Sequence, residues 1–192
     1  VGPGTLVLSN ANTYEGGTLI NGGTLRISAD NNLGLAATAV TNNNGGKLLV
    51  TANMTSGRTF NLNTGSLQVE SGATLTYANA TVNGGFLRGP GTHSIGVNST
   101  FSGVTALNGT NISQSSLTTL VNFTNAGTLT SSAALTWDGG FNTSAGVINV
   151  NSSFNTQAFE NDGVITVFSG GTITNTTSPL VSGGGARLTI NP

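Results

Sequence analysis

The sequence predicts an all-β protein, folded as a right-handed parallel β-helix (a β-solenoid) of about nine or ten coils. A short pattern recurs through the 192 residues: a small residue, a polar residue, then apolar–polar–apolar. Thr (31), Gly (29), Asn (25) and Ser (19) form more than half of the chain, and only 6% of residues are charged, against about 25% in an average globular domain. No stretch has apolar residues at the spacing of an amphipathic helix.

Each copy of the pattern predicts a short strand with alternating apolar residues, bounded by Gly, Asn or Ser. The copies lie at residues 4–8, 23–27, 46–50, 58–62, 65–69, 73–77, 135–137, 146–150, 163–167 and 186–190. The interval 103–117 has no clear copy.

The length of a coil follows from the second half of the chain, where Gly127, Gly146 and Gly163 occupy equivalent positions. About three short strands fall between successive glycines, which indicates a triangular coil. Strands stacked about 4.8 Å apart would give a single rod roughly 45 Å long over residues 1–192. A solenoid has a thin interior, so the 11 aromatic residues suffice.

The composition suits this architecture. Gly and Asn supply the positive φ angles that tight corners need, and Asn and Thr side chains can stack along the rod. The net charge of −1 offers no electrostatic footprint for nucleic acid. No apolar run approaches the roughly 20 residues of a membrane span, and the lack of cysteine excludes disulfides and thiolate sites. We therefore expect a monomer without cofactor, nucleic-acid partner or membrane insertion.

The N-terminal stretch reads N-T-Y-x-G-G-T-x-x-x-x-G-T-L and then L-G, and it resembles the autotransporter-associated β-strand repeat. The resemblance covers roughly residues 3–70, and the second half is similar to haemagglutinin-like coils. The residues that carry the repeat motif are Asn12, Thr13, Tyr14, Gly16, Gly17, Thr18, Gly23, Thr24, Leu25, Leu33 and Gly34.

This resemblance implies a β-helical passenger segment of a large, secreted bacterial surface protein, without a catalytic site. Its signal and anchor are expected outside the segment, which we interpret as a fragment of a longer protein.

Because parallel β-helices often host polysaccharide-cleaving enzymes, carboxylate pairs were considered as catalytic groups. The candidates are Glu160 and Asp162, with Asp138 one or two coils earlier. We interpret Asp162-Gly163 as a turn and Glu160 as a solvent-exposed residue that flanks this turn.

The other chemically distinctive residues also favour structural roles. His93 and Ser94 are neighbours on a predicted strand and point to opposite faces, which excludes a direct Ser–His pair. The stretch 30–34 resembles a calcium loop, but its single carboxylate is too few for a metal, and we interpret it as a turn. Tyr77 and Trp137 each lie two residues after a leucine on a predicted strand, so each points to the same side as that leucine. Both are predicted to lie in the interior of the solenoid. The sequence therefore predicts no catalytic or metal site and identifies no binding residue.

The predicted function is a structural or adhesive passenger segment at the bacterial cell surface, acting as a rigid stalk or an adhesin module. Its expected partners are host or environmental surface glycans or matrix proteins. The alternative is a polysaccharide-binding or polysaccharide-degrading β-helix. A minor alternative, an ice-binding solenoid, rests on Thr-x-Thr pairs that do not form a regular array in the sequence. These pairs are Thr74/Thr76, Thr128/Thr130 and Thr172/Thr174.

Overall fold

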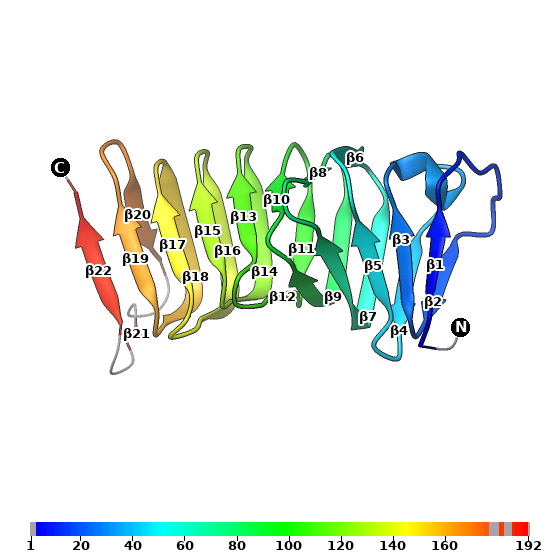
Figure 1. Cartoon of the computed structure of the whole chain (residues 1–192). Coiled ribbons are helices and arrows are strands. Elements are labelled where there is room, and N and C mark those ends of the chain that lie inside the picture. The colour runs from blue at the N-terminus through cyan, green and yellow to red at the C-terminus, as the bar shows by residue number, and fades with distance from the viewer. Residues whose placement is uncertain (1–2, 177–180, 183–185, 192) are drawn as a thin grey trace.

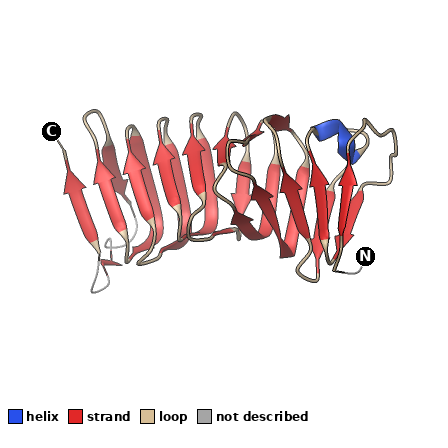
Figure 2. Ribbon diagram, in the orientation of Figure 1, coloured by secondary structure: helices blue, strands red, loops and turns tan. Residues whose placement is uncertain are grey.

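The chain winds into a rod of stacked coils, with its two ends at opposite ends of the rod (Figure 1). The computed structural model describes residues 3–176, 181–182 and 186–191. All pairings between its strands are parallel and join successive coils. Within these ranges the only helix is one 3₁₀ turn, η1 (Asp30–Leu33), which lies near the N-terminal end (Figure 2).

Each complete coil has three faces. We name each face after one of its strands: β17 (Val147–Val150), β3 (Thr24–Ile27) and β11 (Thr100–Ser102). The β17 face is the eight-stranded sheet; the larger sheet bends around a corner and supplies the β3 and β11 faces, so that its longest strands belong to both. The strands of the β17 face are β6 (Met54–Ser56), β8 (Thr74–Tyr77), β10 (Thr92–Ile95), β13 (Asn111–Gln114), β15 (Thr128–Ser131), β17 (Val147–Val150), β19 (Val164–Val167) and β22 (Arg187–Ile190).

The two other faces share five bent strands: β7 (Thr59–Val69), β9 (Thr81–Arg88), β14 (Thr118–Asn125), β16 (Leu135–Asn142) and β18 (Ser153–Asn161). The β11 face adds β2 (Thr18–Asn21), β4 (Val40–Asn43), β11 (Thr100–Ser102) and β20 (Thr172–Asn175). The β3 face adds β1 (Thr5–Leu8), β3 (Thr24–Ile27), β5 (Lys47–Val50), β12 (Thr105–Ala106) and β21 (Val181–Ser182).

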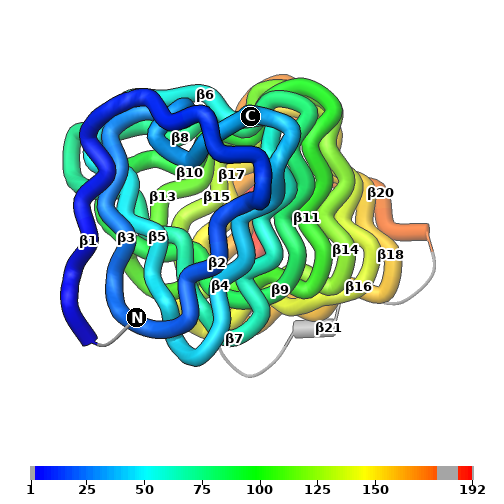
Figure 3. The backbone as a smooth tube through the Cα atoms, turned by 90° about the vertical axis from the view of Figure 1, so that its right-hand side faces the viewer, coloured from blue at the N-terminus to red at the C-terminus, as the bar shows by residue number. Residues whose placement is uncertain are grey.

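The solenoid is right-handed and has about nine coils. Seen from the N-terminal end, the chain rises along β1, crosses the top and descends along β2, so that it turns clockwise as it recedes (Figure 3). The β11 face contains nine strands among the described residues, one for each coil. The predicted fold class is therefore confirmed.

The predicted strands and the predicted coil spacing are found in the structure. Every copy of the sequence pattern falls in a strand. The three equivalent glycines stack, because Val147 N donates to the Gly127 carbonyl at 2.9 Å and Val164 N donates to the Gly146 carbonyl at 2.9 Å. These axial bonds repeat from coil to coil and pair backbone N–H and C=O groups that would otherwise be unsatisfied.

The sequence shows no clear strand pattern in residues 103–117, but the structure has two strands there, β12 and β13. The apolar–polar–apolar pattern is not visible there, because β13 turns the polar residue Gln114 into the interior in place of an aliphatic one. Ser131 Oγ on the next coil donates to Gln114 Oε1 at 2.9 Å, so the buried amide has a partner.

The interior combines aliphatic columns with a row of aromatic rings. Tyr77 and Trp137 are fully buried, as predicted. Successive rings meet mostly edge to face, with centroids 4.8–6.5 Å apart, a favourable geometry for aromatic pairs. The row consists of Phe60, Tyr77, Phe101, Phe123, Trp137, Phe154 and Phe159.

Three buried asparagines form a ladder along the second half of the rod. Asn125 Nδ2 donates to Asn142 Oδ1 at 2.9 Å, and Asn142 Nδ2 donates to Asn161 Oδ1 at 2.7 Å. Asn125 and Asn161 also accept a bond from the backbone N–H of the glycine two residues later. The Asn-x-Gly sequences thus join one coil to the next and fix the turn that follows.

One corner, between the β11 and β3 faces, has a left-handed residue in six successive coils. The φ angles there lie between +44° and +65°, and the strand register places the six residues above one another. They are Asn63, Gly84, Gly103, Asn122, Gly139 and Ala158. The abundance of Gly and Asn follows in part from this corner.

The inward assignment of the strands can be tested with Ile165, which is fully buried on β19, and its outward neighbour Thr166. Ile165→Asp places an unpaired charge in the interior and is expected to cost more than about 4 kcal/mol of unfolding free energy. Thr166→Asp is expected to change it by less than about 0.5 kcal/mol. Equal urea midpoints for the two variants would contradict the assignment, and Leu67→Asp with Gln68→Asp repeats the test on β7.

Candidate functional site

The three carboxylates considered as catalytic groups do not share one face of the rod. Glu160 is exposed on the β3 face and Asp162 directly follows β18, whereas Asp138 lies across the corner on the β11 face. In the described ranges, no three His, Asp or Glu side chains gather as a metal site would need. The ion pairs found there, Arg58–Asp30 and Arg26–Glu70, involve none of the three candidates.

His93 lies in the core of the rod and is shielded from solvent. Its Nδ1 is 2.8 Å from Tyr77 Oη on the neighbouring coil, and its Nε2 is 3.0 Å from the Arg88 carbonyl. Burial disfavours the charged imidazolium and lowers the pKa of His93 to about 4, and burial raises the pKa of Tyr77. Tyr77 and His93 therefore pack within the interior, out of contact with solvent.

The residues of the repeat motif join two N-terminal loops, residues 9–17 and 28–39. Asn12 Nδ2 donates to the Asn32 carbonyl at 2.8 Å, and Leu35 N donates to the Tyr14 carbonyl at 3.1 Å. Gly34 has φ +72°, and a Cβ there would collide with the Tyr14 backbone and ring. A side chain at this position would therefore separate the two loops.

Other motif residues have simpler positions. Leu25 and Leu33 are buried, Gly17 and Gly23 have positive φ, and Tyr14 Oη lies 2.8 Å from Thr18 Oγ1. Thr13 and Gly16 are exposed, and a Cβ on Gly16 would meet nothing within 4 Å. Local packing does not explain these two.

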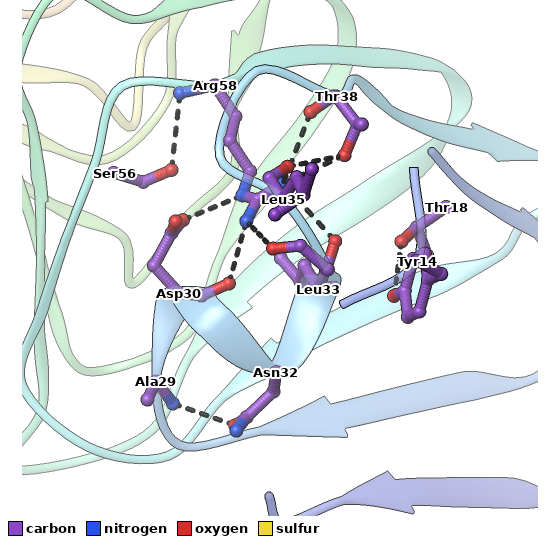
Figure 4. Close-up of polar contacts among 11 residues, drawn as sticks. Tyr14, Thr18, Ala29, Asp30, Asn32, Leu33, Leu35, Thr38, Ser56 and Arg58 are labelled. Atoms are coloured by element: carbon purple, nitrogen blue, oxygen red, sulfur yellow. Dashed lines mark hydrogen bonds and ion pairs between the residues drawn. The ribbon is translucent and has the colours of Figure 1, made fainter. Parts of the chain in front are cut away.

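Arg58 anchors the second loop (Figure 4), a role that no local sequence pattern predicted. Its side chain is fully buried; Nε pairs with Asp30 Oδ1 at 2.9 Å. The guanidinium also donates to the carbonyls of Asp30, Gly34 and Leu35 at 2.7–3.0 Å. Weaker bonds reach the carbonyls of Leu33 and Thr38, and Thr38 Oγ1 lies at 3.0 Å. A planar, permanently charged donor suits such a cluster of acceptors.

A shallow groove of about 490 Å³, lined by both polar and apolar atoms, lies between the two loops, beside β2. Its lining residues are Glu15, Gly16, Gly17, Thr18, Leu19, Ala37, Thr38, Ala39 and Thr41. A carboxylate and hydroxyls can bind a polar ligand by hydrogen bonds, but the lining contains no second acid or base for proton transfer. A separate, mainly apolar hollow of about 290 Å³ is lined by Leu6, Leu8 and Tyr14 among others.

Columns of outward hydroxyl groups run along the β11 and β17 faces. On the β11 face five threonines follow one another outward in register: Thr59, Thr81, Thr100, Thr119 and Thr136. On the β17 face the pairs Thr74/Thr76 and Thr128/Thr130 belong to the same two columns, whereas Thr172/Thr174 lies on the β11 face. Between the first two pairs the columns contain Thr92/Ser94 and Asn111/Ser113. The threonine pairs are thus more regular in space than in the sequence, but they do not share one face.

Comparison with known proteins supports the N-terminal resemblance. Residues 1–27 match the family described as the passenger-associated-transport-repeat. A stretch of 74 residues, 38% of this chain, is 49% identical to the adhesin BmaC autotransporter of Brucella suis biovar 1 (strain 1330), of which it covers only 2%. No solved structure matches the chain. The resemblance to an autotransporter passenger repeat is therefore confirmed.

No helix long and apolar enough to cross a membrane occurs in the part of the chain that the structure describes.

Loss of the Arg58 anchor is expected to destabilise the N-terminal coils. Arg58→Ala leaves Asp30 and several carbonyls without their donor, and breaking a buried ion pair in this way costs about 3–5 kcal/mol. The control is Arg26→Ala, whose partially exposed pair with Glu70 should contribute no more than about 1 kcal/mol. Hydrogen exchange should accelerate in residues 28–38 of Arg58→Ala, and equal unfolding free energies for both variants would contradict the role of Arg58.

His93 is expected to make stability depend on pH. Because its folded pKa of about 4 lies below the ordinary value of 6.5, the unfolded chain binds more protons between these values. The contribution is complete above pH 6.5 and is lost as pH falls towards 4, amounting to about 3 kcal/mol. Urea unfolding of the wild type and His93→Gln across this range should show the slope only in the wild type; equal slopes would refute it.

Proposed function

We propose that this chain is a structural and adhesive passenger segment of a secreted bacterial surface protein, located outside the cell. The observation that carries the proposal is the coincidence of an uninterrupted solenoid with similarity to an adhesin autotransporter over 74 residues. Because this chain spans about 2% of that protein, the activity of the whole adhesin is not transferred to it.

The geometry supports the role of a rigid stalk. Every coil is hydrogen-bonded to its neighbours, and beyond the two N-terminal loops the corners are short. The buried Asn ladder and aromatic row continue through several coils. A chain with few mobile loops offers few sites for proteases and keeps its length under load.

The adhesive role rests on the outer surface, and its partners would be surface glycans or matrix proteins. The groove beside Glu15 and the hydroxyl columns of the β11 and β17 faces offer many donors and acceptors in fixed geometry. The polysaccharide-degrading alternative is less well supported. Glu160 and Asp138 lie on different faces, and the ion pairs of the described residues place no cation beside Glu160 or Asp162. We therefore propose binding without catalysis.

The proposal predicts saturable binding without bond cleavage. The purified chain would be coated on beads and incubated with matrix proteins, polysaccharides and whole cells, while released reducing sugar is measured in parallel. We expect binding to at least one surface with polymer length unchanged. Released sugar from the wild type that disappears in Glu160→Gln would overturn the non-enzymatic proposal.

A further inference from the structure

The β3 face differs from the other two faces in the side chains that it presents outward. Three of the four cationic side chains that are not fully buried, Arg26, Lys47 and Arg88, lie on β3, β5 and β9 of this face. These strands lie on the near side of the N-terminal half of the rod (Figure 1). The fourth cation, Arg187, lies on β22 near the other end. In a chain of net charge −1, the cations are thus gathered in one place.

The strand register defines the shape of this basic patch. Arg26, Leu49, Gln68 and Arg88 follow one another in one outward column, and Thr24, Lys47, Ser66 and Phe86 form the adjacent column. Three strand spacings separate Arg26 from Arg88, which corresponds to about 14 Å along the rod. Lys47 is diagonal to Arg26, about 7–8 Å away.

The patch also contains an aromatic ring. The guanidinium carbon of Arg88 lies 5.6 Å from the centroid of Phe86, within the range of a cation–π contact. Phe86 is only partly buried, so it presents apolar surface next to a cation. Gln68, partly exposed between Leu49 and Arg88, adds an amide donor and acceptor.

The single anion of the patch does not neutralise it. Arg26 Nη2 lies 3.8 Å from Glu70 Oε2, and both side chains are nearly half exposed, at 47% and 40%. Such a pair is weak in water and too long for a hydrogen bond. The donors of Arg26 therefore remain available to an incoming carboxylate.

The charge spacing points to the class of ligand. Duplex nucleic acid carries one charge per about 1.7 Å of axis, far denser than three cations over about 14 Å. A linear glycan with carboxylates on its uronic acid units has a lower charge density. Arginine binds carboxylates bidentately, and an aromatic ring such as Phe86 can pack against the apolar face of a sugar.

We propose that the basic patch (Arg26, Lys47, Phe86 and Arg88) binds a linear acidic polysaccharide through its uronate carboxylates, with the glycan chain running along the rod. This inference rests on the proposed adhesive function and gives it a site and a ligand class.

The experiment uses immobilised polygalacturonate and, as matched ligand, the same polymer after reduction of its carboxyl groups to alcohols. The wild type should bind the acidic polymer, with affinity that falls as salt rises. It should bind the reduced polymer at least about tenfold more weakly, since the charge-assisted bonds to the carboxylates are lost. Equal binding to both polymers, or no binding to the acidic one, would overturn the inference.

The matched variants are Arg88→Gln within the patch and Arg187→Gln outside it, each of which removes one exposed cation. Arg88→Gln should weaken binding by about tenfold, Phe86→Ala should also weaken it, and Glu70→Gln should strengthen it. Arg187→Gln should leave the affinity unchanged. Equal effects of the two arginine variants would overturn the inference, as would tighter binding of duplex DNA than of polygalacturonate at the same salt concentration.

Different results would contradict the basic patch and the adhesive function. A chain that binds a matrix protein or a cell but ignores polygalacturonate contradicts the basic patch and leaves the adhesive role intact. A chain that binds none of these surfaces contradicts both.

Discussion

The structure depends on one constraint: in six successive coils the chain must turn the same corner with the same left-handed backbone conformation, so that the next coil lies in register above it. That corner is occupied by Gly or Asn in five of the six successive coils and by Ala158 in the sixth. With the corner fixed, parallel axial hydrogen bonds form on all three faces, alternation directs apolar side chains inward, and ladders such as Asn125–Asn142–Asn161 can align.

Much of the fold could be predicted from the sequence, because period-two alternation and the Gly spacing are local signals. Strand β13 was missed because Gln114 is polar and inward, and its acceptance of a bond from Ser131 depends on a contact between coils. Arg58 could not be recognised as the anchor of the second N-terminal loop. Its partner Asp30 is 28 residues away, and the local sequence around Asp30 predicts only a turn. The burial of Tyr77 and Trp137 was predictable from their phase with leucine.

The outer surface was much less predictable, since its columns exist only when the register is known. Arg26, Lys47 and Arg88 are scattered in the sequence, yet they share one face over three strand spacings. The rod thus combines a repetitive scaffold with a chemically distinct strip. Because the coils supply rigidity, outward side chains can differ from face to face at little cost to stability, and this division of roles suits a protein that both spans distance and makes contacts.

The most direct test of this account is the free energy of unfolding of two opposite substitutions in the left-handed corner. Ala158 is exposed with φ +47°, whereas Gly139 has φ +65° and a Cβ there would lie 2.6 Å from Asn122 Oδ1. The account predicts that Ala158→Gly stabilises the chain by about 1 kcal/mol and that Gly139→Ala destabilises it by at least about 1 kcal/mol. Changes of the same sign, or no change in either variant, would contradict the claim that this corner governs the stacking of the coils.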